Sequence, residues 1–138
     1  MYTNNNGLIL KMKVTAEKNK KVANMVFASI YPLYLNRLEK KGRTKEELNQ
    51  VIECYTGFDP DALQALIDAK ATYSVFFQKA NINPNAHMIK GVVCGYRIEE
   101  IEDEFELYKQ CRQLEKLIDE LARGRKMEKI LRDEKMKK

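Results

Sequence analysis

The sequence predicts a small all-α domain, an orthogonal bundle of five or six helices with a long C-terminal helix. Apolar residues recur at the spacing of one helix face along most of the chain, and residues typical of helix ends separate these stretches. The chain has 138 residues, the size of one domain with a hydrophobic core. Hydrophobic residues make up 44% and charged residues 33%, a composition that excludes a wholly disordered protein.

Composition changes at both ends of the chain. Residues 1–18 lack a usable period and contain a run of three asparagines, so we expect a disordered leader. Met12 is an alternative native start, which would make residues 1–11 an upstream extension. Residues 19–132 are expected to form a single helical domain, and residues 133–138 a charged tail.

Two helices are expected in the first third of the chain. Helical spacing begins at Val22, but Pro32 has no amide hydrogen and restricts Tyr31, so we expect a break near residues 29–32. A second helix starts at this proline. Gly42 is expected to end it, because glycine readily adopts the left-handed conformation found after a helix C-terminus.

The next three helices have clear N-terminal signals. Thr44 and Glu47 form a capping box, and the helix that they start is expected to stop at Gly57. Asp59, which precedes a proline, caps a second helix, and Thr72 caps a short third one. These signals are local, so they define helix ends without any knowledge of the tertiary structure.

Residues 82–103 interrupt the helical pattern and contain the only histidine of the chain. The apolar run 86–94 is too short to distinguish a helix from a buried strand, and Gly91 and Gly95 permit irregular backbone. We favour a helix for this run, with a small β element near residues 89–98 as the alternative. Irregular, well-defined segments often carry binding residues, which makes this tract the first place to look for a site.

The long C-terminal helix is predicted to start at Asp103, where Glu106 completes a cap, and to stop at Gly124. Its apolar positions step by four and three residues: Leu107, Cys111, Leu114, Ile118 and Leu121. We expect this stripe to lie against the earlier helices and to form the centre of the core.

Several separated blocks of the chain match a known pattern. They are Phe27-Ala28-Ser29-Ile30-Tyr31-Pro32-Leu33-Tyr34, Lys41-Gly42-Arg43-Thr44-Lys45-Glu46-Glu47, Thr56-Gly57-Phe58, Asn83-Pro84-Asn85-Ala86, residues 91–103, Leu121-Ala122-Arg123-Gly124 and Met127-Glu128-Lys129-Ile130-Leu131. Through these blocks the chain resembles the uncharacterised prokaryotic family called domain of unknown function 2200, over residues 20–132. The resemblance implies a small, mainly helical bacterial domain without an assigned activity. It also argues against a catalytic role for His87, because other residues commonly occupy that place in the family.

The sequence excludes several classes of protein. Cys54, Cys94 and Cys111 are an odd number without Cys-x-x-Cys spacing, so neither a disulfide framework nor a zinc site is predicted. A reducing cytoplasm is therefore the expected location. No apolar stretch approaches the roughly 18 residues of a membrane span, so no membrane partner is expected. No cofactor is predicted either, because no cofactor-binding motif is present.

Two groups of residues contain the elements of a catalytic or metal site. His87 and Cys94 could act as base and nucleophile, but the sequence places no orienting acid beside them, and a buried structural cysteine is the commoner case. An acidic helix start, favoured by the helix dipole, is the simpler interpretation of the second group. This group comprises four carboxylates that would share one helix face and could hold a hard cation: Glu99, Glu102, Asp103 and Glu106. No catalytic or metal-binding residue is therefore assigned.

Candidate contacts to a ligand or partner lie in the irregular tract: Asn83, Asn85, Tyr96, Arg97, Glu99 and Glu100. The planar Arg97 guanidinium can bind a carboxylate or a phosphate through two parallel hydrogen bonds. Pairing with the acidic residues that follow it is the simpler interpretation.

The function that the sequence favours is a small cytoplasmic, non-enzymatic protein-interaction module, because the polar groups do not converge on a reaction geometry. Its partner would be another protein, or a second copy bound through the stripe of the long helix. The first alternative is a nucleic-acid-binding protein that uses the basic residues of 11–21 and 123–138. The second is a small enzyme or ligand-binding protein with a pocket in the tract Asn83–Asp103.

Overall fold

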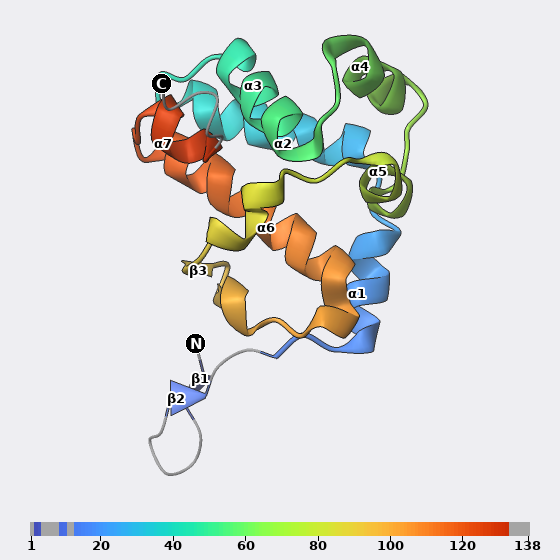
Figure 1. Cartoon of the computed structure of the whole chain (residues 1–138), viewed down its shortest axis with the longest axis vertical. Helices are drawn as coiled ribbons and strands as arrows, with labels where there is room; N and C mark the ends of the chain where they lie inside the picture. Colours follow the sequence, from blue (N-terminus) through green and yellow to red (C-terminus); the bar gives the residue numbers. More distant parts are fainter. Residues whose placement is uncertain (1, 4–8, 11–12, 133–138) are drawn as a thin grey trace.

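The computed structural model describes residues 2–3, 9–10 and 13–132 of the chain (Figure 1). Seven α-helices lie within these residues: α1 (Ala16–Ala23), α2 (Phe27–Glu39), α3 (Lys45–Thr56), α4 (Pro60–Asp68), α5 (Tyr73–Lys79), α6 (Glu106–Ala122) and α7 (Met127–Leu131). Three 3₁₀-helices and two antiparallel hairpins accompany them: η1 (Pro84–Met88), η2 (Ile98–Glu100), η3 (Asp103–Phe105), β1 (Tyr2–Thr3) with β2 (Ile9–Leu10), and β3 (Val92–Val93) with β4 (Tyr96–Arg97). The predicted all-α bundle is confirmed, with seven helices where five or six were expected.

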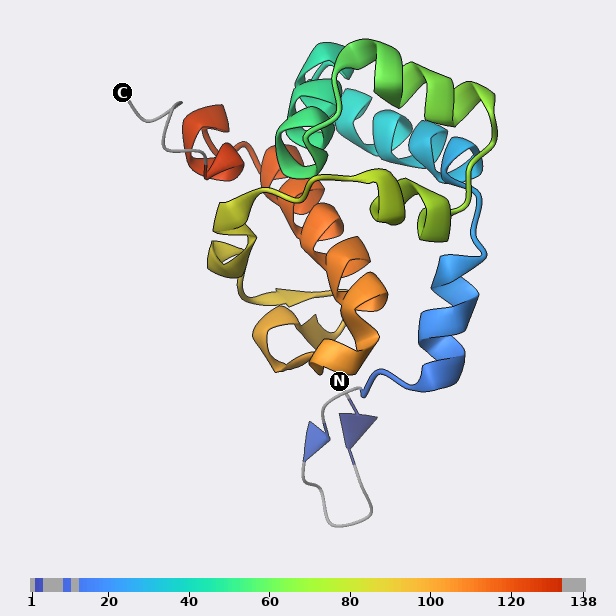
Figure 2. The ribbon, with the colours of Figure 1, turned by 45° about the vertical axis from the view of Figure 1, so that its right-hand side comes forward.

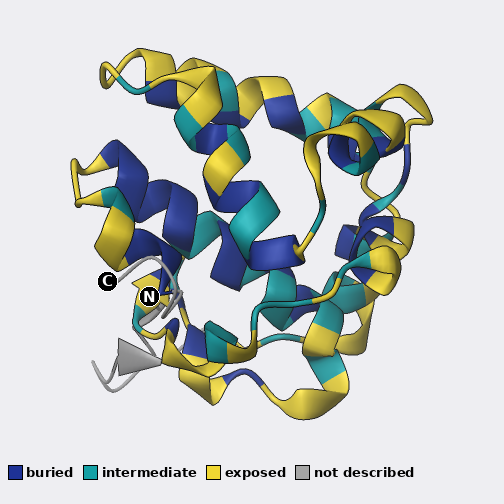
Figure 3. Ribbon diagram, turned by 45° about the horizontal axis from the view of Figure 1, so that its top comes forward, coloured by how far each residue is buried: buried dark blue, intermediate teal, exposed yellow. Residues whose placement is uncertain are grey.

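Helix α6 lies at the centre of the bundle. It contacts α1, α2, α3, α5 and α7, and the views in Figures 1 and 2 show these helices arranged around it. Leu114, Ile118 and Leu121 are completely buried, and Leu107 at the start of the stripe is half-buried. Figure 3 shows that the burial is on the inner faces of the helices and that the turns are exposed. The predicted interior stripe is therefore confirmed.

Local capping signals predicted the ends of the middle helices correctly. The Thr44 hydroxyl accepts a hydrogen bond from the amide of Glu47 at 3.1 Å, and the Glu47 carboxylate accepts one from the amide of Thr44 at 3.0 Å. Gly57 ends α3 with a φ of +75°, and the Asp59 carboxylate accepts a hydrogen bond from the amide of Ala62 at the start of α4. These contacts satisfy backbone groups that the helices leave unpaired.

The predicted helix break at residues 29–32 is wrong. Helix α2 runs through Pro32, and the break lies earlier, where Val26 pairs with Thr72 in an isolated β-bridge. Pro32 is exposed and lies in the second turn of the helix, so its ring faces solvent and the missing amide removes only the bond to the carbonyl of Ala28. Tertiary pairing therefore places the break, and the proline is tolerated.

The helix favoured for residues 86–94 is also wrong, and the alternative β element is confirmed. The 3₁₀-helix η1 ends at Met88, and the hairpin β3–β4 follows. Cys94 and Gly95 form its two-residue turn with φ angles of +52° and +84°. Two successive positive φ angles match the right-handed twist of a tight hairpin and cannot occur in an α-helix.

Helix α6 begins at Glu106, three residues later than predicted. Phe105 occupies the N-cap position without a side-chain hydrogen bond, and residues 103–105 form η3. The four carboxylates expected on one helix face are therefore divided among η2, the loop after it, η3 and α6. At the N-terminal end of the domain, α1 begins at Ala16. The charged tail predicted for residues 133–138 lies outside the described residues.

Candidate functional site

Asn83 and Asn85 hold η1 against the rest of the domain. The Asn83 side chain accepts a hydrogen bond from the amide of Asn85 at 2.8 Å and donates one to the carbonyl of Cys54 in α3 at 3.4 Å. The Asn85 amide group donates to the carbonyl of Arg132, immediately after α7, at 2.6 Å. Both side chains are occupied by contacts within the protein, so the structure gives them a positioning role for the tract.

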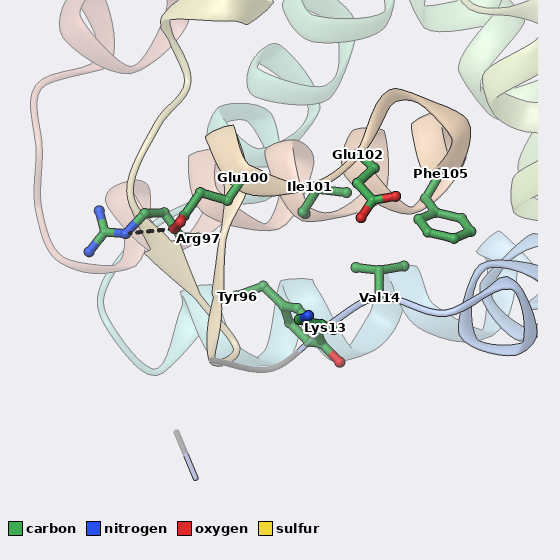
Figure 4. Close-up of a pocket in the computed structure, with 8 residues that line it drawn as sticks. All are labelled: Lys13, Val14, Tyr96, Arg97, Glu100, Ile101, Glu102 and Phe105. Atoms are coloured by element: carbon green, nitrogen blue, oxygen red, sulfur yellow. Dashed lines mark ion pairs between the residues drawn. The ribbon is translucent and has the colours of Figure 1, made fainter. Parts of the chain in front are cut away.

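Three of the other candidate residues, Tyr96, Arg97 and Glu100, line one small pocket (Figure 4). In Figure 4 the Arg97 guanidinium points away from Val14 and Phe105, and its Nε atom is 3.4 Å from the Glu100 carboxylate. The volume of about 160 Å³ is below the roughly 300–1,000 Å³ of typical ligand pockets. The pocket has room for a single side chain of a partner.

Tyr96 joins the hairpin to α1 and α6. Its hydroxyl accepts a hydrogen bond from Lys18 Nζ at 3.0 Å, and its ring packs edge-on against Tyr108 at 5.3 Å. The Arg112 guanidinium lies over both rings and also pairs with Glu115. Burial alone would raise the pKa of the Tyr96 phenol, but hydrogen bonds with Tyr108 and Lys18 and the charges of Lys18 and Arg112 outweigh it, so that the pKa is lowered.

The sixth candidate, Glu99, lies on a larger groove between η1, η2 and the first turns of α6. This acidic groove has a volume of about 470 Å³. Its lining combines the carboxylates of Glu99, Asp103 and Glu106 with the amine of Lys109 and with four aliphatic side chains, of which two are buried: Ile82, Ala86, Ile89 and Ile98. The Glu99 carboxylate accepts a hydrogen bond from the amide of Gly91 at 3.1 Å, and such backbone hydrogen bonds lower its pKa. It therefore stays ionised at and below neutral pH.

The structure assigns His87 and Cys94 to separate contacts. His87 Nδ1 lies 3.0 Å from the carbonyl of Pro84, which can only accept, so this nitrogen carries the proton. The Cys94 thiol donates to the Glu115 carboxylate at 3.7 Å, and burial together with that carboxylate raises its pKa. A raised pKa disfavours the thiolate that a nucleophile requires. No cluster of metal-ligating side chains occurs among the described residues either.

The basic residues of 13–21 and of 123–132 lie apart in the structure. Helix α1 contacts the start of α6, where the amide of Tyr108 donates to the Asn19 side chain at 3.0 Å. Arg123 follows the last residue of α6, about 25 Å away along a helix of 17 residues. The cations of residues 123–129 instead lie near the turn between α2 and α3, because Asp119 pairs with both Arg37 and Arg123. Sequence reasoning missed this neighbourhood, which depends on tertiary contacts.

Comparison with known proteins places the whole bundle in a family. The family described as an uncharacterized protein conserved in bacteria, domain of unknown function 2200, matches residues 21–132. The chain belongs to this family. All residues of the acidic groove lie inside the matched range of this domain of unknown function 2200, whereas Val14 of the small pocket precedes it. The resemblance noted in the sequence is thus confirmed.

A solved structure shares this fold. The crystal structure of the uncharacterized protein SP1917 is 38% identical to the chain, with a TM-score of 0.75, and the match covers 86% of this chain and 95% of that one. No curated protein matches the chain. In the part of the chain that the structure describes, no helix has the length and apolar character needed to cross a membrane.

Proposed function

We propose that this protein is a cytoplasmic, non-enzymatic interaction module, and that its acidic groove accepts a basic, partly apolar segment of a partner protein. The observation that carries the proposal is the composition of the groove, in which three carboxylates and four aliphatic side chains line a volume of about 470 Å³. This volume lies within the range of binding pockets, unlike that of the small pocket. The three free cysteines support a reducing compartment.

Lysine and arginine side chains suit a groove that is lined by carboxylates and by aliphatic groups. Their aliphatic stems cover apolar surface while their charged ends stay at the polar edge. Asp103 is fully exposed and its contact with Lys109 is long, at 3.7 Å, so a partner cation can approach this carboxylate without breaking a strong ion pair. Glu99 is held in place by the Gly91 amide and stays charged. The groove therefore offers preorganised negative charge beside an apolar surface.

A binding role is also favoured over catalysis by the state of the nucleophilic and basic side chains. The Cys94 thiol has a raised pKa, and the proton on His87 Nδ1 is directed to a carbonyl rather than to a carboxylate that would orient the ring. Gln113, in the groove, accepts from the Tyr55 hydroxyl at 2.5 Å and donates to the carbonyl of Ala86. These groups serve the packing of the tract.

The proposal is tested with fluorescein-labelled peptides of alternating lysine and leucine, read by fluorescence anisotropy at low salt. A variant with Glu99→Gln, Asp103→Asn and Glu106→Gln should bind about tenfold more weakly, because rim charges contribute tenths to one kcal/mol each. The matched control carries the same change at three other helix starts: Glu17→Gln, Glu46→Gln and Asp61→Asn. It should bind like the unmodified protein.

Two results would contradict the acidic groove as the binding site. One is equal loss of affinity in the two variants, and the other is equal binding of a glutamate–leucine peptide. If the partner is a second copy of the chain, light scattering should show a mass that rises with concentration, and the groove variant should abolish the rise.

A further inference from the structure

Helices α2 and α6 end in the same way and with the same sequence pattern. Lys41-Gly42-Arg43 follows α2, and Arg123-Gly124-Arg125 follows α6. The glycines have φ angles of +77° and +87°, and a Cβ atom added to either would have no neighbour within 4 Å. Each turn therefore presents a cation and an open glycine to the surface, and Arg125 is half-exposed, whereas Arg43 is largely buried and pairs with Glu47.

The hydrogen bonds of the two turns also agree. The arginine amide that follows each glycine donates to the carbonyl five residues earlier, at 2.9 Å in the first turn and 3.1 Å in the second. The glycine amide donates to the carbonyl three residues earlier, at 3.1 Å in both. This pair of bonds defines the Schellman motif, which fixes the direction in which the chain leaves the helix. The two triplets are thus held in rigid, matching conformations.

The two turns lie at the same end of the molecule (Figure 1). Asp119 connects them, since its carboxylate oxygens pair with Arg37 of α2 at 2.6 Å and with Arg123 at 2.9 Å. Residues 37–47 and 119–132 contain ten basic and six acidic residues, and we call these two segments the basic end. The charge of +4 is larger than the net charge of all the remaining described residues.

The buried carboxylates of the basic end are neutralised from within, so the excess positive charge lies outside. Glu120 pairs with Arg125 at 2.9 Å and with Arg132 at 2.8 Å, and Asp119 likewise has two arginine partners. Five lysines of the basic end are exposed and form no ion pair with a described residue: Lys40, Lys41, Lys45, Lys126 and Lys129. A partner with a regular array of negative charges can contact them without displacing an internal carboxylate.

We propose that the basic end binds the phosphate backbone of a nucleic-acid duplex without reading its sequence. Phosphate contacts require only cations on a rigid, accessible surface. Arginine binds a phosphate through its planar guanidinium, and lysine binds it through a single ammonium charge. Binding of single strands relies on aromatic side chains that stack on bases, and neither segment of the basic end contains one. This argument is independent of the acidic groove, which lies at the opposite end of α6.

The test is fluorescence anisotropy with a labelled DNA duplex of about two helical turns, over a series of salt concentrations. The unmodified chain should bind with a logarithmic salt dependence. The variant Lys40→Gln, Lys41→Gln, Lys126→Gln and Lys129→Gln should bind at least tenfold more weakly at low salt. Its salt slope should fall by about 3.6, since each of the four lost phosphate contacts contributes roughly 0.9 to the slope.

A control of equal charge separates this site from general electrostatic attraction. The variant Lys20→Gln, Lys21→Gln, Lys79→Gln and Lys90→Gln removes four exposed lysines outside the basic end, and its affinity should stay within about twofold. Equal weakening of the two variants would overturn the proposal, as would competition by polyglutamate as effective as that by DNA. Tighter binding of a single strand than of the duplex would overturn it as well.

Discussion

The two ends of α6 have opposite charge, but one rule governs both. Residues 96–106, before and at the start of the helix, contain six acidic residues and one basic residue, whereas the basic end has an excess of four positive charges. Both distributions complement the dipole of α6, which favours anions at its N-terminus and cations at its C-terminus. The dipole therefore accounts for the sign of the charge at each end of α6. It does not determine which of the charged residues stabilise the fold.

At each end of α6 a few charged side chains are largely buried, while most of the charges that dominate that end are exposed. Asp119 and Glu120, two of the six carboxylates of the basic end, are 8% and 7% exposed and pair with arginines. Near the acidic end, in the second turn of α6, the Arg112 side chain is 16% exposed and lies over two tyrosine rings, whereas Arg97 is half-exposed and Asp103 is in full contact with solvent. We therefore expect the buried charged side chains to stabilise the fold and the exposed ones to be available to partners.

The largest effect is expected from removing Glu120 at the basic end. Glu120→Leu leaves the Arg132 guanidinium buried without its anion, so the free energy of unfolding should fall by about 3–5 kcal/mol in urea titrations. Glu128→Leu, an exposed carboxylate of the same end, should change it by about 0.5 kcal/mol or less. The double variant Glu120→Leu with Arg132→Met should recover much of the loss, because an apolar pair needs no charge compensation. A fall of less than about 1 kcal/mol in the free energy of unfolding of Glu120→Leu would contradict the difference between the buried Glu120 and the exposed Glu128.

The sequence predicted those parts of the fold that depend on local contacts. Thr44 with Glu47 and the left-handed Gly57 act within one helix, so their signals are independent of the tertiary structure. Pro32 was misjudged because its effect depends on facing solvent, and the true break depends on the pairing of Val26 with Thr72, far along the chain. The run before Cys94 was ambiguous because its left-handed turn residue is neither glycine nor asparagine.

The candidate site was predictable in its location and less so in its roles. The irregular tract does border two pockets, as its glycines and broken pattern indicated. Asn83 and Asn85, however, bind Cys54 and Arg132, which are 29 and 47 residues away in sequence, so no local pattern could reveal their positioning role. The basic end also depends on tertiary contacts, because Asp119 brings Arg37 and Arg123 together in the folded chain.

A smaller loss of stability is expected from removing Arg112, the largely buried cation near the acidic end. Arg112→Met removes charged hydrogen bonds to Glu115 and to the Tyr108 hydroxyl, together with the contact over Tyr96, so the free energy of unfolding should fall by about 2 kcal/mol. Arg97→Met is the matched control, because its ion pair is half-exposed on both sides and should contribute about 0.5 kcal/mol or less. Urea titration measures the free energy of unfolding of the two variants. An equal fall in both would contradict the distinction between buried and exposed cations.

The smallest effect is spectroscopic and concerns Tyr96, whose phenol lies next to the cations of Lys18 and Arg112. Because its pKa is lowered in the folded protein, its ionisation contributes stability above pH 10, and that contribution is lost as the pH falls through the folded pKa. Burial, chiefly, raises the pKa of Tyr108 to about 12, so its neutral form contributes stability that is lost as the pH rises from 10 to 12. Tyrosinate absorbance should therefore show one phase below pH 10 that Tyr96→Phe removes and that Arg112→Met moves to higher pH. Persistence of that phase in Tyr96→Phe would show that Lys18 and Arg112 do not act on this phenol.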